Sequence, residues 1–168
     1  MKDNIILIGF MGAGKTTVGR YIANHWAMNF ADFDEEISKQ EKMSINEIFA
    51  AHGEKYFRDM EKLTIQRFMG CENFVISTGG GIVKERENVQ ALRKIGKVIY
   101  LKASIQTLFD RIKDSGDRPL LKSPEPFKDF EHIFEERRKN YELADIIINT
   151  ENKSVEDIVR KIDEKINS

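Results

Sequence analysis

The chain has 168 residues, which fits one domain better than two. Its formal net charge of −1, from 27 Lys and Arg against 28 Asp and Glu, argues against a broad surface for DNA or RNA. With 11 Gly, 3 Pro and 1 Cys, it is not collagen-like, disordered or stapled by disulfides. We expect neither a signal peptide nor a membrane span, and therefore a protein of the reducing cytoplasm.

The first predicted strand, residues 4–9, leads into a glycine-rich loop and then into an apolar helical repeat. Residues 9–16 read GFMGAGKT and match the phosphate-binding pattern G-x-x-x-x-G-K-[ST] in full. Glycines let backbone N–H groups approach a phosphate, while Lys15 is placed for the β- and γ-phosphates and the Thr16 hydroxyl for Mg²⁺. The order of strand, loop and helix favours a nucleoside triphosphate site over a glycine-rich surface turn.

Two other classes of P-loop protein are disfavoured by missing patterns. A GTPase should carry N-K-x-D, and the nearest string, residues 152–155, lacks the Asp. No run of four apolar residues ends in Asp-Glu, as motor and transporter ATPases would require. A small phosphotransferase remains the best class.

The second predicted strand, residues 30–33, carries Asp32 and Asp34 at its carboxyl end. Side chains two apart in an extended chain point to one side, here toward the crevice where open α/β sheets bind ligands. One carboxylate could hold Mg²⁺ through water, and the other could accept or orient a hydroxyl proton. A helix N-cap at Asp34, followed by Glu35 and Glu36, explains the same residues equally well.

Two helical patterns come next. A capping box at residues 44–47 predicts one helix start, and residues 57–68 carry a second apolar face. Glu54 and Glu61 lie at helical pairing distance from Arg58. By itself, this spacing predicts a solvated ion pair.

The third predicted strand, residues 74–77, is followed by Thr78 and three glycines, residues 79–81. Three glycines at the carboxyl edge of a sheet leave bare backbone against which a ligand could lie. The alternative is a tight turn before a helix that begins near Glu85.

The fourth predicted strand, residues 98–101, precedes a helical segment and then a long loop. Residues 114–126 read DSGDRPLLKSPEP and contain all three prolines of the chain. A loop of this length in a compact domain is usually functional or disordered. We predict a mobile lid here, because Arg118 and Lys122 give it positive charge that an anion could order; a floppy surface connection is the alternative.

A helix after this loop has an apolar face that includes Phe130, Phe134 and Tyr141, and Arg137 occupies the next position on that face. Such an arginine either extends outward to solvent or lines an interior anionic site, where its planar fork suits a carboxylate. Arg138, one position round, is predicted at the surface.

The last predicted strand and helix are residues 146–149 and 155–166. Apolar strands that alternate with helical patterns predict an open parallel sheet with helices on both faces. Because no heptad seam or exposed apolar stripe is evident, we expect a monomer.

Together these motifs resemble the shikimate kinase family, in order and over nearly the whole chain. The residues that carry the resemblance are GFMGAGKTTVGR from Gly9, Phe30-x-Asp32-x-Asp34, Gly53-Glu54-x-x-Phe57-Arg58, the glycines at 79–81, Arg118-Pro119-Leu120-Leu121 and Arg137-x-x-x-Tyr141. The resemblance implies an α/β fold of the P-loop NTPase type: a three-layer sandwich with a five-stranded parallel sheet in the order 2-3-1-4-5. It also implies one domain, residues 1–168, with a lid at about 114–126.

The resemblance implies transfer of the ATP γ-phosphoryl group to the 3-hydroxyl of shikimate, on the route to chorismate and the aromatic amino acids. Lys15, Asp34 and Arg118 would be catalytic, Thr16 and Asp32 would hold Mg²⁺, and Glu61 would orient Arg58. ATP would contact Gly12, Ala13, Gly14, Lys15, Thr16, Thr17, Arg118 and Lys153; shikimate would contact Asp34, Arg58, Gly80 and Arg137. The loop before the last helix is often arginine-rich in the family, whereas here it offers Lys153.

Two other functions fit the same residues. One is phosphorylation of another small metabolite or of a nucleoside monophosphate, and the other is non-catalytic sensing of ATP. The paired arginines and aspartates favour catalysis, because a sensor needs no acceptor pocket.

Overall fold

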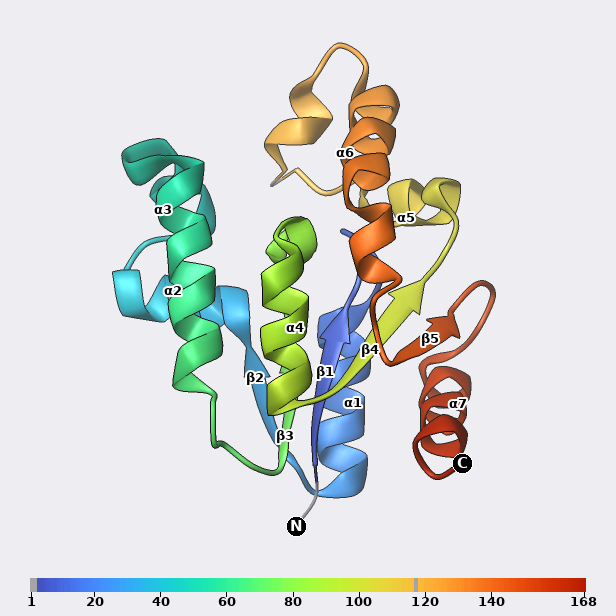
Figure 1. Cartoon of the computed structure of the whole chain (residues 1–168). Coiled ribbons are helices and arrows are strands. Elements are labelled where there is room, and N and C mark those ends of the chain that lie inside the picture. The colour runs from blue at the N-terminus through green and yellow to red at the C-terminus, as the bar shows by residue number, and fades with distance from the viewer. Residues whose placement is uncertain (1–2, 117) are drawn as a thin grey trace.

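The computed structural model describes residues 3–116 and 118–168. Its centre is a parallel sheet of five strands in the order β2-β3-β1-β4-β5, which confirms the expected order (Figure 1). Every predicted strand is present, with ends that differ by no more than two residues from those expected. The strands are β1 (Asn4–Ile8), β2 (Asn29–Asp32), β3 (Phe74–Ser77), β4 (Gly96–Lys102) and β5 (Ile146–Asn149).

Helices cover both faces of the sheet and make a three-layer sandwich. Helix α1 packs against α7 on one face, and α3 packs against α4 on the other (Figure 1). No described helix is long and apolar enough to cross a membrane. The α-helices are α1 (Lys15–Trp26), α2 (Phe33–Glu41), α3 (Ile45–Arg67), α4 (Arg86–Ile95), α5 (Ile105–Ile112), α6 (Pro126–Tyr141) and α7 (Val155–Ile166); the short 3₁₀ helices are η1 (Ile82–Lys84) and η2 (Pro119–Lys122).

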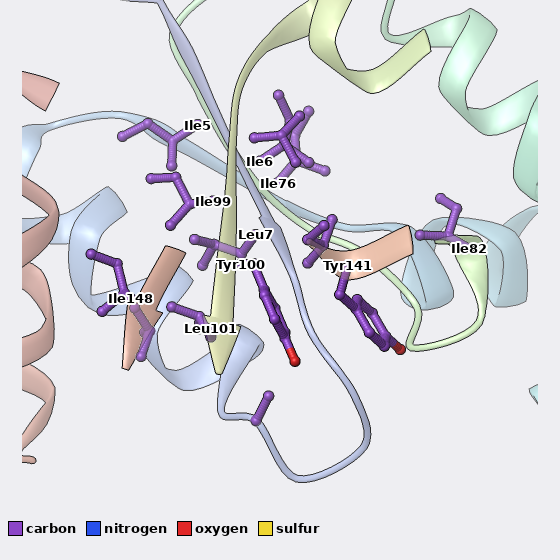
Figure 2. Packing of buried hydrophobic residues seen from close by; sticks show 14 of the residues in the cluster. Ile5, Ile6, Leu7, Ile76, Ile82, Ile99, Tyr100, Leu101, Tyr141 and Ile148 are labelled. Carbon is purple, nitrogen blue, oxygen red and sulfur yellow. The ribbon is translucent and has the colours of Figure 1, made fainter. Parts of the chain in front are cut away.

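The core consists of the strands and the helix faces that cover them. All five residues of β1 are buried, as expected for an apolar strand without polar alternation in the middle of a covered sheet. Figure 2 shows Ile5 and Ile99 on one side of the sheet and Ile6 and Ile76 on the other. Burial on both faces holds β1 in place, and the chain leaves β1 directly into the glycine-rich loop.

Helix α3 joins the two helical patterns seen in the sequence. Its capping box is present, since the Ser44 hydroxyl accepts from the Glu47 amide at 3.2 Å and the Glu47 carboxylate accepts from the Ser44 amide at 2.7 Å. Gly53 interrupts the helix with φ 82° and ψ 174°, a conformation that a side chain would strain. The break redirects the second half of α3, which carries Arg58 and Glu61.

The predicted lid contains more regular structure than expected. Helix η2 lies inside the segment 114–126, and Leu120 and Leu121 are half-buried against the core. Asp117 belongs to the predicted lid but lies outside the described residues. The expectation of a long irregular loop is therefore wrong for residues 119–122, because two leucines anchor them.

Candidate active site

A polar cavity of about 270 Å³ lies where the P-loop, the end of β2 and the turn after β3 meet. It is found at the carboxyl edge of the parallel sheet, where open α/β folds bind ligands. Its lining brings together the P-loop, both aspartates, the glycine turn and the arginine of the predicted lid: Met11, Gly12, Ala13, Gly14, Lys15, Thr16, Thr17, Asp32, Asp34, Thr78, Gly80 and Arg118.

The P-loop has the geometry of an anion site. Gly12 and Gly14 adopt positive φ angles of 81° and 86°, and a Cβ on Gly12 would lie 2.7 Å from the Leu108 carbonyl oxygen. Helix α1 begins directly after Gly14, so its free N–H groups and the positive end of its dipole are at the cavity. Lys15 Nζ donates to the carbonyl oxygens of Gly9 at 2.7 Å and Phe10 at 3.3 Å.

The Lys15 ammonium is buried next to acidic groups. Burial lowers the pKa of Lys15 to about 8, while Asp34 and Asp32 act in the opposite direction. A cation at the base of the P-loop, with reduced hydration, interacts strongly with an anion that enters the cavity.

The Thr16 hydroxyl and the Asp32 carboxylate form a pair of oxygen donors. Thr16 Oγ1 donates to Asp32 Oδ2 at 2.9 Å and lies 3.3 Å from Ser77 Oγ. In the described part of the chain, no group of three or more His, Cys, Asp or Glu residues could hold a metal ion. Hydroxyl and carboxylate oxygens do fit Mg²⁺, which is commonly bound by one or two protein oxygens, water and substrate phosphates.

Asp32 also starts helix α2, which corrects the expected N-cap at Asp34 and the expected extended backbone there, while both aspartates line the cavity. Asp32 Oδ1 accepts from the backbone N–H groups of Asp34 at 3.0 Å and Glu35 at 3.3 Å. The N-cap is therefore Asp32 and not Asp34, and the strand ends before Phe33. Asp34 lies in the first helical turn and still reaches the cavity.

Asp34 lies against bare backbone. A Cβ on Gly79 would be 2.6 Å from Asp34 Oδ1, so a side chain at this position would displace the carboxylate. Burial and the neighbouring Asp32 raise the pKa of Asp34, whereas Lys15 and Arg58 oppose the shift. The result is a carboxylate of increased proton affinity beside the P-loop lysine.

Arg58 and Glu61 form a buried ion pair, which corrects the expected solvated one. Arg58 Nη1 donates to Glu61 Oε2 at 2.8 Å, and the two side chains are 12% and 1% exposed. Burial raises the pKa of Glu61 to about 7 against the opposing effect of Arg58. A Cβ on Gly81 would lie 2.6 Å from both terminal nitrogens of Arg58, so the guanidinium lies directly on the glycine turn.

Arg137 is held inside the fold, and Arg138 is not. The Arg137 guanidinium carbon lies 5.7 Å from the centre of the Phe10 ring, and its buried Nε has no hydrogen-bond partner. Arg137 is not among the described residues that line the cavity, although its charge acts on Glu61 and on Lys15. Arg138 has a half-exposed side chain paired with Glu135, as predicted for a surface residue.

Lys153, an expected contact of ATP, lies apart from the cavity, whereas Arg111, which was not expected, contacts the P-loop. Lys153 is not among the described residues that line the cavity, and its Nζ donates to the Glu151 carbonyl oxygen at 3.1 Å. Arg111 of α5 was not singled out in the sequence, yet its Nη1 donates to the Gly12 carbonyl oxygen of the P-loop at 3.0 Å. Its position just before the predicted lid is the only sequence signal that could have pointed to it.

Comparisons with known proteins agree with this geometry. The family model described as shikimate kinase matches residues 11–167. The chain is 46% identical over 159 residues to a shikimate kinase of Persephonella marina, covering 95% of this chain and 96% of that relative. It is 43% identical over 163 residues to a shikimate kinase of a Sulfurihydrogenibium species, covering 97% of each.

Solved structures give the same result. Shikimate kinase from Acinetobacter baumannii, in complex with shikimate, superposes with a TM-score of 0.92 at 33% identity and covers 99% of this chain and 93% of that one. Shikimate kinase from Aquifex aeolicus gives a TM-score of 0.86 at 39% identity, covering 98% of this chain and 96% of that one. The chain therefore belongs to the shikimate kinase family, a family of ATP-dependent phosphotransferases.

Proposed function

We propose that the polar cavity is the active site in which the γ-phosphoryl group of ATP is transferred to the 3-hydroxyl of shikimate. The observation that carries the proposal is that Lys15, Asp34 and Arg118 line one cavity. A phosphate-binding loop and a carboxylate of raised proton affinity then face each other, which is the arrangement that transfer between two bound substrates requires.

On the nucleotide side, the backbone of Gly12, Ala13 and Gly14 would hold the phosphates, assisted by Thr16 and Thr17 at the start of α1. Lys15 would neutralise charge that develops on the γ-phosphoryl oxygens. Lys153 remains our proposal for a contact near the base, although it lies outside the cavity lining.

Thr16 and Asp32 would hold Mg²⁺, since their oxygens lie together at the end of the P-loop. Bound magnesium would neutralise negative charge on the phosphates. The chain's own contribution is to keep the hydroxyl and the carboxylate side by side on two different elements.

On the acceptor side, Arg58 and Arg137 would bind the shikimate carboxylate, Gly80 would contact the ring through its backbone, and Asp34 would orient the 3-hydroxyl. Glu61 would hold Arg58 in place. As the new oxygen–phosphorus bond forms, the bond from γ-phosphorus to the bridging oxygen breaks and ADP leaves. The hydroxyl proton passes to Asp34 Oδ or to the phosphate, since a loose transition state demands little of a base.

Arg118 would enter with the lid, residues 114–126, and face the phosphates. Closure would exclude water and so limit hydrolysis of ATP. Support comes from the position of Arg118, which lines the cavity and lies directly before η2.

The test is ADP release with ATP and Mg²⁺, with and without shikimate. We expect release to depend on shikimate and to stop when shikimate is exhausted. A panel of nucleoside monophosphates and other hydroxy acids separates this function from that of a related kinase; equal turnover without any acceptor would contradict it. Light scattering checks the monomer that we propose.

A further inference from the structure

The end of α6 holds the glycine turn by two consecutive side chains. The Tyr141 hydroxyl donates to the Gly80 carbonyl oxygen. Asn140 Nδ2 donates to the carbonyl oxygen of Val83 at 2.8 Å, in the 3₁₀ helix that follows the turn. A helix that carries Arg137 is thereby attached to the turn on which Arg58 lies.

The Tyr141 ring is fixed on more than one side. It has no exposed surface and stacks on Tyr100 with centroids 5.1 Å apart and planes 13° apart. Phe10 meets it edge-on at 6.5 Å, and the same Phe10 ring lies next to the Arg137 guanidinium. Figure 2 shows the Tyr141 hydroxyl directed toward the loop that leads to Ile82. The packing of the ring therefore gives the hydroxyl a defined position.

Arg137 interacts with this hydroxyl from one helical turn earlier. Burial raises the pKa of Tyr141, against the opposing effect of the Arg137 charge. The hydroxyl thus stays protonated and donates to the Gly80 carbonyl oxygen. Helix α6, which carries both Arg137 and Tyr141, and this hydrogen bond together connect the guanidinium to the backbone of the turn.

We infer that Tyr141 is a positioning residue for the acceptor: its hydroxyl sets the spacing between Arg137 and the glycine turn, and hence between the Arg137 and Arg58 guanidinium groups. The bond to the Gly80 carbonyl orients the peptide plane between Gly80 and Gly81, and Gly81 is the residue that Arg58 covers. A carboxylate held by two arginines needs that spacing fixed before it binds. The inference rests on the proposed function of these arginines.

The primary test is Tyr141→Phe, which keeps the ring and removes only the hydroxyl. We expect kcat/KM for shikimate to fall about five- to tenfold, the effect of losing one hydrogen bond that aligns a charged group. The KM for ATP should change less than about twofold, because phenylalanine keeps the ring that contacts Phe10 of the P-loop and the lost hydroxyl bonds only the glycine turn. Direct titration with shikimate by calorimetry should show the same loss of affinity.

Asn140→Ala is the matched control, because it removes the neighbouring bond to Val83 without touching Gly80. We expect a lower melting temperature and a shikimate kcat/KM within about twofold of the wild type. The inference is overturned if Asn140→Ala lowers kcat/KM as much as Tyr141→Phe does. It is also overturned if Tyr141→Phe weakens ATP and shikimate alike.

A double-mutant cycle with Arg137→Ala completes the test. If the hydroxyl acts through Arg137, the double variant loses less shikimate kcat/KM than the product of the two single losses. A fully multiplicative loss overturns the link. If Arg137→Ala alone changes nothing, the acceptor assignment fails and the inference fails with it; if Arg137→Ala is impaired and Tyr141→Phe is normal, only the positioning role fails.

Discussion

The two halves of the site are built in different ways. The nucleotide half comes mainly from residues 9–17, one continuous stretch that follows β1 and includes the first turn of α1, and it relies on backbone groups. The acceptor half takes its residues from α2, α3, the turn after β3 and α6, and relies on charged side chains in contact. A phosphate site can therefore be local in the chain, whereas a site for a particular acid depends on the assembled fold.

The two halves of the site also differ in whether their buried polar atoms have hydrogen-bond partners. Among the described residues, two buried side-chain polar atoms lack a hydrogen-bond partner, Glu61 Oε1 and Arg137 Nε, and both belong to the acceptor half. Unpaired buried polar atoms cost stability and call for an explanation such as a ligand. Lys15, by contrast, donates to two carbonyl oxygens of its own loop. A bound ligand should therefore stabilise the acceptor half more than the nucleotide half, because it can supply the missing hydrogen bonds.

The largest expected effect lies in the nucleotide half. Lys15→Ala should lower kcat by about 10³-fold or more, because it removes the cation that faces the transferred group. Circular dichroism should show the fold retained, since the side chain occupies a cavity edge. Lys39→Ala, at an exposed site, is the control and should be normal. Unchanged turnover in Lys15→Ala would refute the role of the P-loop.

Arg58→Ala and Arg137→Ala should act on the acceptor alone. We expect the KM for shikimate to rise about 10- to 100-fold, as for other charge-assisted contacts, with little change in the KM for ATP. Arg138→Ala is the matched control, because the Arg138 side chain is half-exposed and pairs with Glu135. An equal rise in the KM for ATP and for shikimate would mean that these arginines do not belong to the acceptor half alone.

Gly81→Ala tests the contact between the turn and Arg58. The added methyl would lie 2.6 Å from both Arg58 terminal nitrogens, which can move aside because they end a flexible side chain. We expect about a tenfold rise in the KM for shikimate and a nearly unchanged melting temperature. On an Arg58→Ala background the same change should have no further effect. A further rise in the KM for shikimate in the double variant would show that the methyl does not act through Arg58.

The last and smallest expected effect is on stability: Glu61→Gln should change the free energy of unfolding in a pH-dependent way. The pKa of Glu61 is about 7 in the folded chain against an ordinary 4.5, so the native state binds more protons between these values. The stabilising contribution is complete below pH 4.5 and is lost as pH rises through 7. The difference in unfolding free energy between wild type and variant should fall by on the order of 2 kcal/mol from pH 5 to pH 8. Urea unfolding measures it, and a difference that does not vary with pH would contradict the assignment.

Local patterns in the sequence were enough for much of the fold and for the nucleotide half. The apolar strands, the capping box at Ser44 and the P-loop are each read from neighbouring residues, and the structure contains all three. Arg137 was also singled out from its place in an apolar helical register, which allowed either an arginine that extends to solvent or one that lines an interior anionic site.

The acceptor half contained features that no local pattern carries. The spacing of Arg58 and Glu61 is the same whether the pair is exposed or buried, and only packing against the glycine turn excludes water from it. Likewise, Asp32 and Asp34 could not be assigned between strand and cap, because both alternatives use the same residues. Arg111 reaches the P-loop across 99 positions of sequence, beyond any pattern.

Asp32 has two oxygens with two different partners, and this governs how its substitutions must be interpreted. Oδ1 caps α2 and Oδ2 accepts from Thr16, so an alanine at this position would fray the start of the helix that carries Asp34 and remove the proposed magnesium ligand together. Asparagine caps a helix about as well as aspartate but carries no charge. Asp32→Asn therefore separates helix capping from cation binding. With Asp32→Ala alone, a loss of activity caused by the frayed helix would be attributed to lost metal binding.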